Sequence, residues 1–187
     1  MLTKITLENF KVFRHATEFP LAKINLLTGI NGRGKSSLLQ ALLLMRQSIE
    51  HNENTDKLIL NGNCVHLGTW EDVKNKDEKE DKTLRISFTQ YIHQNRFLIS
   101  SYDFCSKMKI EKFTFSSNKE FKNRNYIDEK ILLSHSVEIN RVKENNSCEV
   151  VFLHHNTTQH KLTGIGVDYR CFYPNILWFY SESIAGD

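Results

Sequence analysis

The feature that most constrains this chain is the glycine-rich segment Gly29–Ser37, which reads Gly-Ile-Asn-Gly-Arg-Gly-Lys-Ser-Ser. From Gly29 to Ser36 it matches the pattern G-x-x-x-x-G-K-[ST] in full. Glycines let the backbone adopt positive φ angles, so that successive N–H groups can point toward the oxygens of a phosphate. A helix that begins where such a loop ends adds unpaired amides and the positive end of its dipole. The segment therefore predicts a phosphate-binding loop.

The sequence on both sides of the loop has the pattern that such a loop needs. Lys23–Thr28, before the loop, is a short segment of β type, and Leu2–Phe10 has the alternation of an opening strand. Leu38–Ile49, after the loop, is apolar nearly all round a helical wheel, which is typical of a buried helix. We therefore expect a strand, the loop and a buried helix, in that order.

The loop supplies most of the candidate site residues. Lys35 is expected to reach the β- and γ-phosphates of a nucleotide, and the Ser36 hydroxyl is expected to bind Mg²⁺. Asn31 and Arg33 would contribute mainly backbone N–H groups. The alternative is a glycine-rich turn that caps a helix beside an unrelated lysine. The predicted nucleotide-binding residues of the loop are Gly29, Ile30, Asn31, Gly32, Arg33, Gly34, Lys35, Ser36 and Ser37.

Beyond residue 50 the pattern changes to one of short strands. Asn61-Gly62 is a turn signal, and Lys74–Lys82 is a mixed run of charges that we interpret as a solvated loop. Alternation over 83–153 predicts an antiparallel meander of four to six strands, with a bulge between Ile110 and Phe113. Ile176–Tyr180 is a further candidate strand. The expected fold is of the α/β class with an added antiparallel sheet, which gives it a mixed α+β character.

Composition excludes several classes of protein. The 187 residues hold 25 Lys+Arg and 22 Asp+Glu, a net charge of +3 that is too small to indicate a nucleic-acid-binding protein by itself. Residues 1–50 carry +4 of this charge, around the predicted anion-binding loop. No apolar run is long enough to cross a membrane and no secretion signal is visible, so a cytoplasmic protein without a membrane partner is expected. Its four cysteines, Cys64, Cys105, Cys148 and Cys171, are then expected to be reduced thiols.

The wording of two segments resembles a known family. Gly29–Ser37 resembles the G-x-N-G-x-G-K-S-S loop of ABC-type ATPase heads, and Ile5–Phe13, Ile-Thr-Leu-Glu-Asn-Phe-Lys-Val-Phe, resembles the first strand of their SMC/RecF/Rad50/OLD branch. Ser37–Leu44 is similar to the stand-alone prokaryotic ATPases of that branch. The resemblance implies a P-loop NTPase core half with an antiparallel β-subdomain, and ATP and Mg²⁺ as ligands. It also implies that Lys11, and after it Arg14, lie near the phosphates; exposed basic residues after an edge strand are the alternative.

The family pattern contains motifs that these residues lack. A Walker B strand ends in Asp-Glu, and a signature resembling L-S-G-G-Q completes the partner's site; neither is visible here. Ile176–Tyr180 is followed by Ser181-Glu182, so that Ser stands where the metal-binding Asp belongs, and Glu182 is a weak candidate for a catalytic base. The resemblance therefore implies a partial head over 1–187, with a core at 1–60, a β-rich part at 61–170 and a strand returning to the core at 171–187. Alone, it is expected to hydrolyse ATP poorly, and its catalytic residues cannot be assigned.

The resemblance leaves two functions open. The first is an ATPase that couples ATP binding and hydrolysis to DNA repair or anti-phage defence, as a homodimer or in a complex with a second subunit. DNA and a nuclease effector are then candidate partners. The second is a non-catalytic nucleotide-binding module that senses or scaffolds. An ABC transporter subunit is disfavoured by the opening strand.

Overall fold

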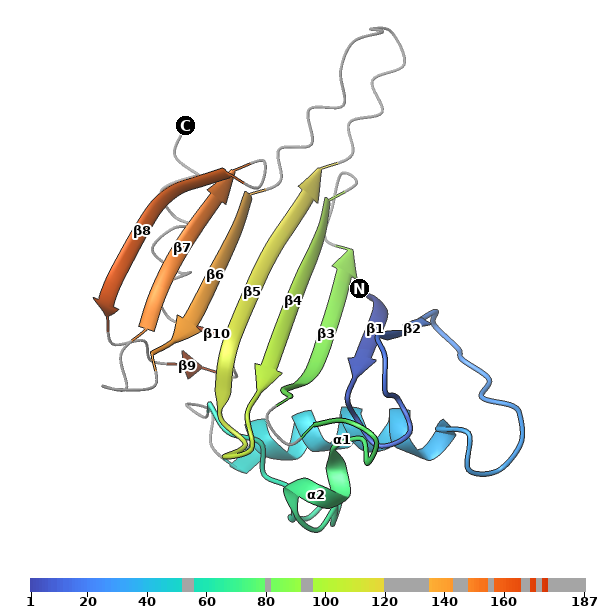
Figure 1. Ribbon diagram of the computed structural model, residues 1–187. Coiled ribbons are helices and arrows are strands. Elements are labelled where there is room, and N and C mark those ends of the chain that lie inside the picture. The colour runs from blue at the N-terminus through green and yellow to red at the C-terminus, as the bar shows by residue number, and fades with distance from the viewer. Residues whose placement is uncertain are drawn as a thin grey trace, which may run out of the picture.

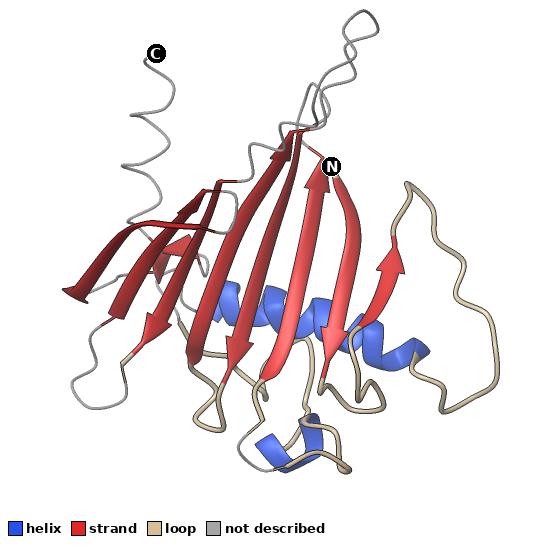
Figure 2. Ribbon diagram, turned by 45° about the horizontal axis from the view of Figure 1, so that its top comes forward, coloured by secondary structure: helices blue, strands red, loops and turns tan. Residues whose placement is uncertain are grey.

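The computed structural model describes residues 1–51, 56–79, 82–91, 96–119, 135–142, 148–154, 157–165, 169–170 and 173–174. Within these residues, one eight-stranded antiparallel sheet carries a long helix across one of its faces (Figures 1 and 2). The elements, in chain order, are β1 (Leu2–Glu8), β2 (Thr17–Pro20), α1 (Lys35–His51), α2 (Trp70–Val73), β3 (Leu84–Tyr91), β4 (Arg96–Phe104), β5 (Ile110–Lys119), β6 (His135–Arg141), β7 (Cys148–His154), β8 (Thr157–Ile165), β9 (Tyr169–Arg170) and β10 (Tyr173–Pro174).

The order of strands in the sheet is β2-β1-β3-β4-β5-β6-β7-β8. From β3 to β8 each strand pairs with the next along the chain, and β3–β7 confirm the meander expected over 83–153. β1 lies between β2 and β3, with Ile5 in register with Phe88. The glycine-rich loop, α1 and α2 are therefore an excursion between two strands that join the same sheet. The predicted core at 1–60 and the predicted β-rich part at 61–170 share this sheet.

Alternation along the strands builds the hydrophobic core. Leu84 and Ile86 are buried on one face of β3, whereas Arg85 between them is exposed. The expected bulge is present in β5, because Asp103 pairs with Lys112 and the next residue of β4, Phe104, pairs with Ile110. The core lies between α1 and the strands β1 to β6. Its most completely buried residues include Ile5, Leu7, Leu44, Leu84, Ile86, Phe104, Ile110, Phe113 and Ile139.

Helix α1 confirms the expected helix after the loop but is not buried all round. Leu38, Ala41 and Leu44 are buried in the core, whereas the side chain of Leu39 is 52% exposed. Figure 2 shows the reason: the helix crosses one face of the sheet, and the sheet can cover only the side that meets it. The apolar wheel correctly indicated helix and burial, but not how much of the circumference the fold covers.

The strand expected at Lys23–Thr28 does not form. Ile24 is 89% and Leu26 86% exposed, and the segment lies in the loop that swings out beyond β2 (Figure 1). An extended segment becomes a strand only when a neighbour takes up its N–H and C=O groups. β1 already pairs with β2 and β3 on its two sides, and this segment does not pair with the outer edge of β2, the end strand of the described sheet.

The end of α1 is tied to the chain that follows it. The Gln47 side chain donates to the carbonyl of Ile59 and accepts from the amides of Cys64 and Val65, at 3.1 and 3.0 Å. Gly62 lies against it, since a Cβ there would come within 2.8 Å of the Gln47 amide group. Gln47 is 4% exposed. Its role is therefore structural, because it joins the end of α1 to the segment that follows.

The charged run Lys74–Lys82 is not simply a solvated loop. Lys74 and Asn75, at its start, are both 6% exposed, and Lys74 is paired with Glu71 at 3.1 Å. Charge in the sequence indicated solvent exposure, but these two residues are covered because the chain here packs against the turn that follows β1. The predicted strand Ile176–Tyr180, Glu182 and Cys171 lie outside the described residues. The other three cysteines are free thiols.

Candidate functional site

The glycine-rich loop has the backbone geometry that its sequence predicts. The φ angles of Gly29, Gly32 and Gly34 are +128°, +81° and +97°, in the region that favours glycine over every other residue. Residues 29–33 are exposed, Gly34 is buried, and α1 begins at the next residue, Lys35. The loop thus leads directly into the N-terminus of a helix of 17 residues, whose first amides lack partners within the helix.

The side chain of Lys35 closes the loop on itself. Its Nζ donates to the carbonyl oxygens of Gly29 and Ile30, at 2.6 and 2.9 Å. Residues five and six positions apart in the chain are therefore brought together, and the ammonium lies beside the first peptides of the loop. Both bonds are exposed to solvent, so the ammonium is accessible to an anion without any rearrangement of covering residues.

One side of the loop is open and the other is closed. A Cβ at Gly29 or Gly32 would meet nothing within 4 Å. A Cβ at Gly34 would lie 2.4 Å from Cζ of Phe13 and 3.0 Å from Cγ2 of Val12. The loop therefore has free space around its first residues, while its last glycine is packed against the turn between β1 and β2.

That turn is tight and unusually well anchored. Phe10 and Phe13 exchange backbone hydrogen bonds at 3.1 and 2.8 Å, and Lys11 between them has a φ of +49°. Asn9, before the turn, has a φ of +54°, a conformation that asparagine adopts more readily than most residues. The short path from β1 back to β2 explains these two left-handed residues.

Asn9 is the anchor of the turn. It is fully buried, and its Nδ2 donates to the carbonyls of Lys82 and Thr83 at 2.9 and 3.1 Å. Its Oδ1 accepts from the amide of Asn75 at 3.0 Å. The side chain of Asn75 in turn donates to the carbonyl of Lys11. One side chain thus joins the turn, the segment after α2 and the start of β3.

The two basic residues assigned by resemblance lie on this turn. The Lys11 amide donates to the carbonyl of Val73 at 2.7 Å, and the residue is half-buried. Lys11 thus belongs to the turn that packs on Gly34. Arg14 is engaged elsewhere, because its Nε donates to the Glu78 carboxylate at 3.0 Å. The sequence pattern did not single out Asn9 or Phe13, although both stand in the segment that carried the resemblance.

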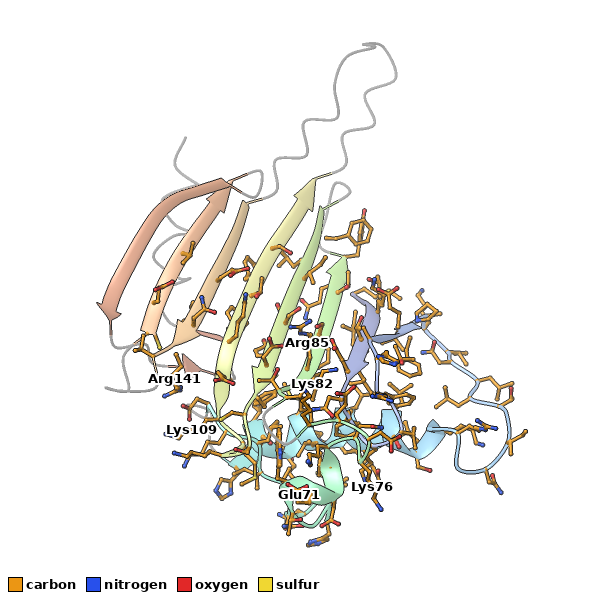
Figure 3. All side chains as sticks on the ribbon, in the orientation of Figure 1. Glu71, Lys76, Lys82, Arg85, Lys109 and Arg141 are labelled. Carbon is orange, nitrogen blue, oxygen red and sulfur yellow. The ribbon has the colours of Figure 1, made fainter. Side chains whose placement is uncertain are left out.

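Charges of alternating sign continue from the turn to the sheet. Glu78 pairs with both Arg14 and Lys82, and Lys82 pairs with Glu8 at 3.4 Å. Figure 3 shows Lys82 beside Arg85 at the end of β3 nearest α1. The hydrogen bond from Arg14, followed by that from Lys82, lowers the pKa of the Glu78 carboxyl. These charged side chains near the turn therefore form ion pairs with one another, which join the turn to the start of β3.

The carboxylate of Asp72 carries a pH dependence that can be measured. It caps α2 by accepting from the Thr69 amide and hydroxyl, both at 2.8 Å, and these two bonds, in that order, lower its pKa. A carboxyl with a lowered folded-state pKa stabilises the fold above its unfolded pKa of about 4, and the contribution is lost as the pH falls through the folded value. We expect Asp72→Asn to lower the unfolding temperature slightly at pH 7 and hardly at all at pH 2, measured by circular dichroism. The same difference at both pH values would contradict the assignment.

Ser36 is the residue that the sequence pattern assigns to a metal ion. It lies in the first turn of α1, next to Lys35, and is exposed. Mg²⁺ usually takes only one or two protein oxygens and completes its shell with phosphate oxygens and water, so a single hydroxyl beside a phosphate loop fits it. Within the described ranges, no group of three or more His, Cys, Asp or Glu residues is arranged to hold a metal ion. In the same ranges no helix is long and apolar enough to span a membrane.

Comparison with known proteins agrees with this site. The sequence profile of the AAA ATPase domain family matches residues 1–169, which include the whole of the glycine-rich loop, α1 and the described sheet. No solved structure matches the chain. The family is that of a nucleotide-binding ATPase, for which ATP with Mg²⁺ is the usual ligand. The chain therefore belongs to the AAA ATPase domain family.

Proposed function

We propose that this chain is the ATP-binding segment of an SMC/RecF/OLD-like ATPase, which couples ATP binding and hydrolysis to DNA repair or anti-phage defence together with a partner or second subunit. The observation that carries the proposal is the loop from Gly29 to Lys35. It combines three positive-φ glycines, an exposed ammonium beside its first peptides and a direct entry into a helix N-terminus. These are the elements that bind a polyphosphate.

The loop residues have distinct roles in the proposed site. The exposed backbone from Gly29 to Arg33 would donate N–H groups to phosphate oxygens, and the first amides of α1 would add the positive end of the helix dipole. Lys35 would exchange its two loop carbonyls for β- and γ-phosphate oxygens, which are stronger acceptors because they are charged. Ser36 would hold Mg²⁺, which supplies neutralisation of the phosphate charge when bound.

The finer assignment to the SMC/RecF/OLD branch rests on the opening segment. Its Asn-Phe-x-x-Phe wording, at Asn9–Phe13, corresponds to a turn that contacts the phosphate loop at Gly34. This contact is a physical link between the opening segment and the loop, the two segments that carry the resemblance. DNA, a nuclease effector and a cytoplasmic setting belong to the proposal through this resemblance alone, as does assembly through the ATPase head.

A titration tests the proposal and the role of Ser36 together. We expect the wild-type chain to bind a fluorescent ATP analogue, and Mg²⁺ to tighten this binding. Ser36→Ala should lose the Mg²⁺-dependent part, by about tenfold in affinity, because it removes the hydroxyl proposed to bind the ion. Binding in the presence of a chelator should be unchanged in this variant.

Ser106→Ala is the matched control, because Ser106 is an exposed serine in the turn between β4 and β5. It should bind as the wild type does. Absence of binding by the wild-type chain would overturn the proposed function. Binding of ATP without hydrolysis, even after DNA is added, would favour the non-catalytic nucleotide-binding module instead.

A further inference from the structure

We infer that Phe13 is a positioning residue for the phosphate-binding loop, which acts by fixing the backbone at Gly34. The inference rests on the proposed function and goes beyond it, because Phe13 is outside the loop and carries no group that could bind a phosphate. It also identifies Asn9 as the residue that holds Phe13 in place.

The contact between ring and loop is close and specific. Cζ and Cε1 of Phe13 lie 2.4 and 2.7 Å from the place that a Cβ of residue 34 would occupy. Real Cβ atoms do not approach other atoms this closely, so the ring occupies space that only a glycine leaves free. Gly34 is also the point where loop becomes helix, since its carbonyl accepts from the Leu38 amide at 3.0 Å. The ring therefore bears on the peptide that precedes Lys35.

The ring itself is held firmly. Phe13 is 8% exposed, and Phe19 packs edge-on against it with ring centroids 5.1 Å apart. Its backbone is paired with Phe10, and Asn9 joins that turn to β3 and to the segment after α2. The sheet thus carries a rigid aromatic edge to one end of a loop whose other residues, 29–33, are exposed.

The consequence concerns nucleotide affinity. A polyphosphate is bound best by N–H groups that already point in the right directions, because any ordering at the moment of binding reduces the affinity. With the ring in place, the chain at Gly34 cannot drift toward β1. Without the ring edge, the last loop peptide and Lys35 gain freedom that binding must remove.

Phe13→Leu is the variant that isolates this contact. Leucine keeps the buried part of the side chain but lacks the Cε1 and Cζ atoms that meet Gly34. Phe88→Leu is the matched control, because Phe88 is a partly buried phenylalanine of β3 that packs edge-on against Tyr102. Each protein is titrated with Mg²⁺·ATP and with Mg²⁺·tripolyphosphate, well below its unfolding temperature, which is measured in parallel.

We expect Phe13→Leu to bind both probes roughly tenfold more weakly than the wild type, since small displacements of positioned groups are costly. Phe88→Leu should change either affinity less than twofold while losing a similar amount of thermal stability. Phe13→Tyr adds a hydroxyl at Cζ, the atom that faces Gly34, and should weaken binding because the added group pushes the loop away. This variant also tests the inference if the leucine variant does not fold.

Wild-type affinity in both Phe13 variants would overturn the inference and leave the proposed function standing. An equal loss in Phe88→Leu would also overturn it, because the effect would then be one of general stability. Failure of the wild-type chain to bind either probe is a different result, which overturns the proposed function itself.

Discussion

Replacing Lys35 by alanine should weaken the binding of Mg²⁺·ATP roughly ten- to hundredfold, the range expected when a hydrogen-bonding charge is lost from a charged ligand. The physical reason is that the Lys35 ammonium contacts the loop peptides directly, through the carbonyls of Gly29 and Ile30. Isothermal titration calorimetry or fluorescence with a labelled ATP analogue measures the effect. Because both hydrogen bonds of the ammonium are exposed, the unfolding temperature should change little.

Lys23→Ala is the control for this experiment. Lys23 is an exposed lysine shortly before the loop, so its removal lowers the net charge by the same amount without touching the loop. Its affinity for Mg²⁺·ATP should stay within about twofold of the wild type, since exposed charges are screened by salt. Equal affinities in wild type and Lys35→Ala would contradict the assignment of the loop, whatever the control shows.

Replacing Asn9 by alanine should lower the free energy of unfolding by about 3 kcal/mol, because buried polar groups that lose their partner carry their full cost of desolvation. The variant leaves the carbonyls of Lys82 and Thr83 and the amide of Asn75 without the side chain that now satisfies them. It also places alanine at a φ of +54°, which is strained. For a chain of this size, the loss corresponds to a fall in the unfolding temperature of about 6–12 °C, measured by calorimetry.

Two further variants separate the causes. Asn9→Gly removes the same hydrogen bonds but relieves the backbone strain, so it should be the less destabilising of the two. Asn25→Ala removes an asparagine that also makes two hydrogen bonds, to the amide and carbonyl of Ala22, but in an exposed loop. It should change the stability by less than about 0.5 kcal/mol. Equal effects of Asn9→Ala and Asn25→Ala would show that burial does not govern the result.

The local pattern of the sequence predicted β1, α1 and the central meander of the sheet. Alternation over 83–153 predicted the meander that contains β3–β7, and the slip between Ile110 and Phe113 located a bulge. The loop and the start of α1 were also predicted correctly, since the glycine positions and the apolar run leave few alternative conformations. These features depend on neighbours close in the chain, which is why the sequence is sufficient for them.

Features that depend on distant residues could not be predicted. Lys23–Thr28 has the residue types of a strand, but a strand also requires a partner, and this segment pairs with none of the described strands. Lys74 and Asn75 are polar yet buried, because a turn more than sixty positions earlier covers them. In the candidate site, the ion pair between Arg14 and Glu78 joins residues more than sixty positions apart, and no local pattern indicates it.

By itself, the sequence determined the glycine-rich loop, the helix that follows it and membership in the AAA ATPase domain family. The loop and the helix are contiguous segments, and their conformations depend on residues that are close together in the chain. Only the tertiary structure decided which side of α1 is buried, and that Phe13, held by Asn9, closes one side of the loop at Gly34. Those outcomes follow from the order in which strands pair, and strand order is fixed by contacts between segments that no local pattern connects.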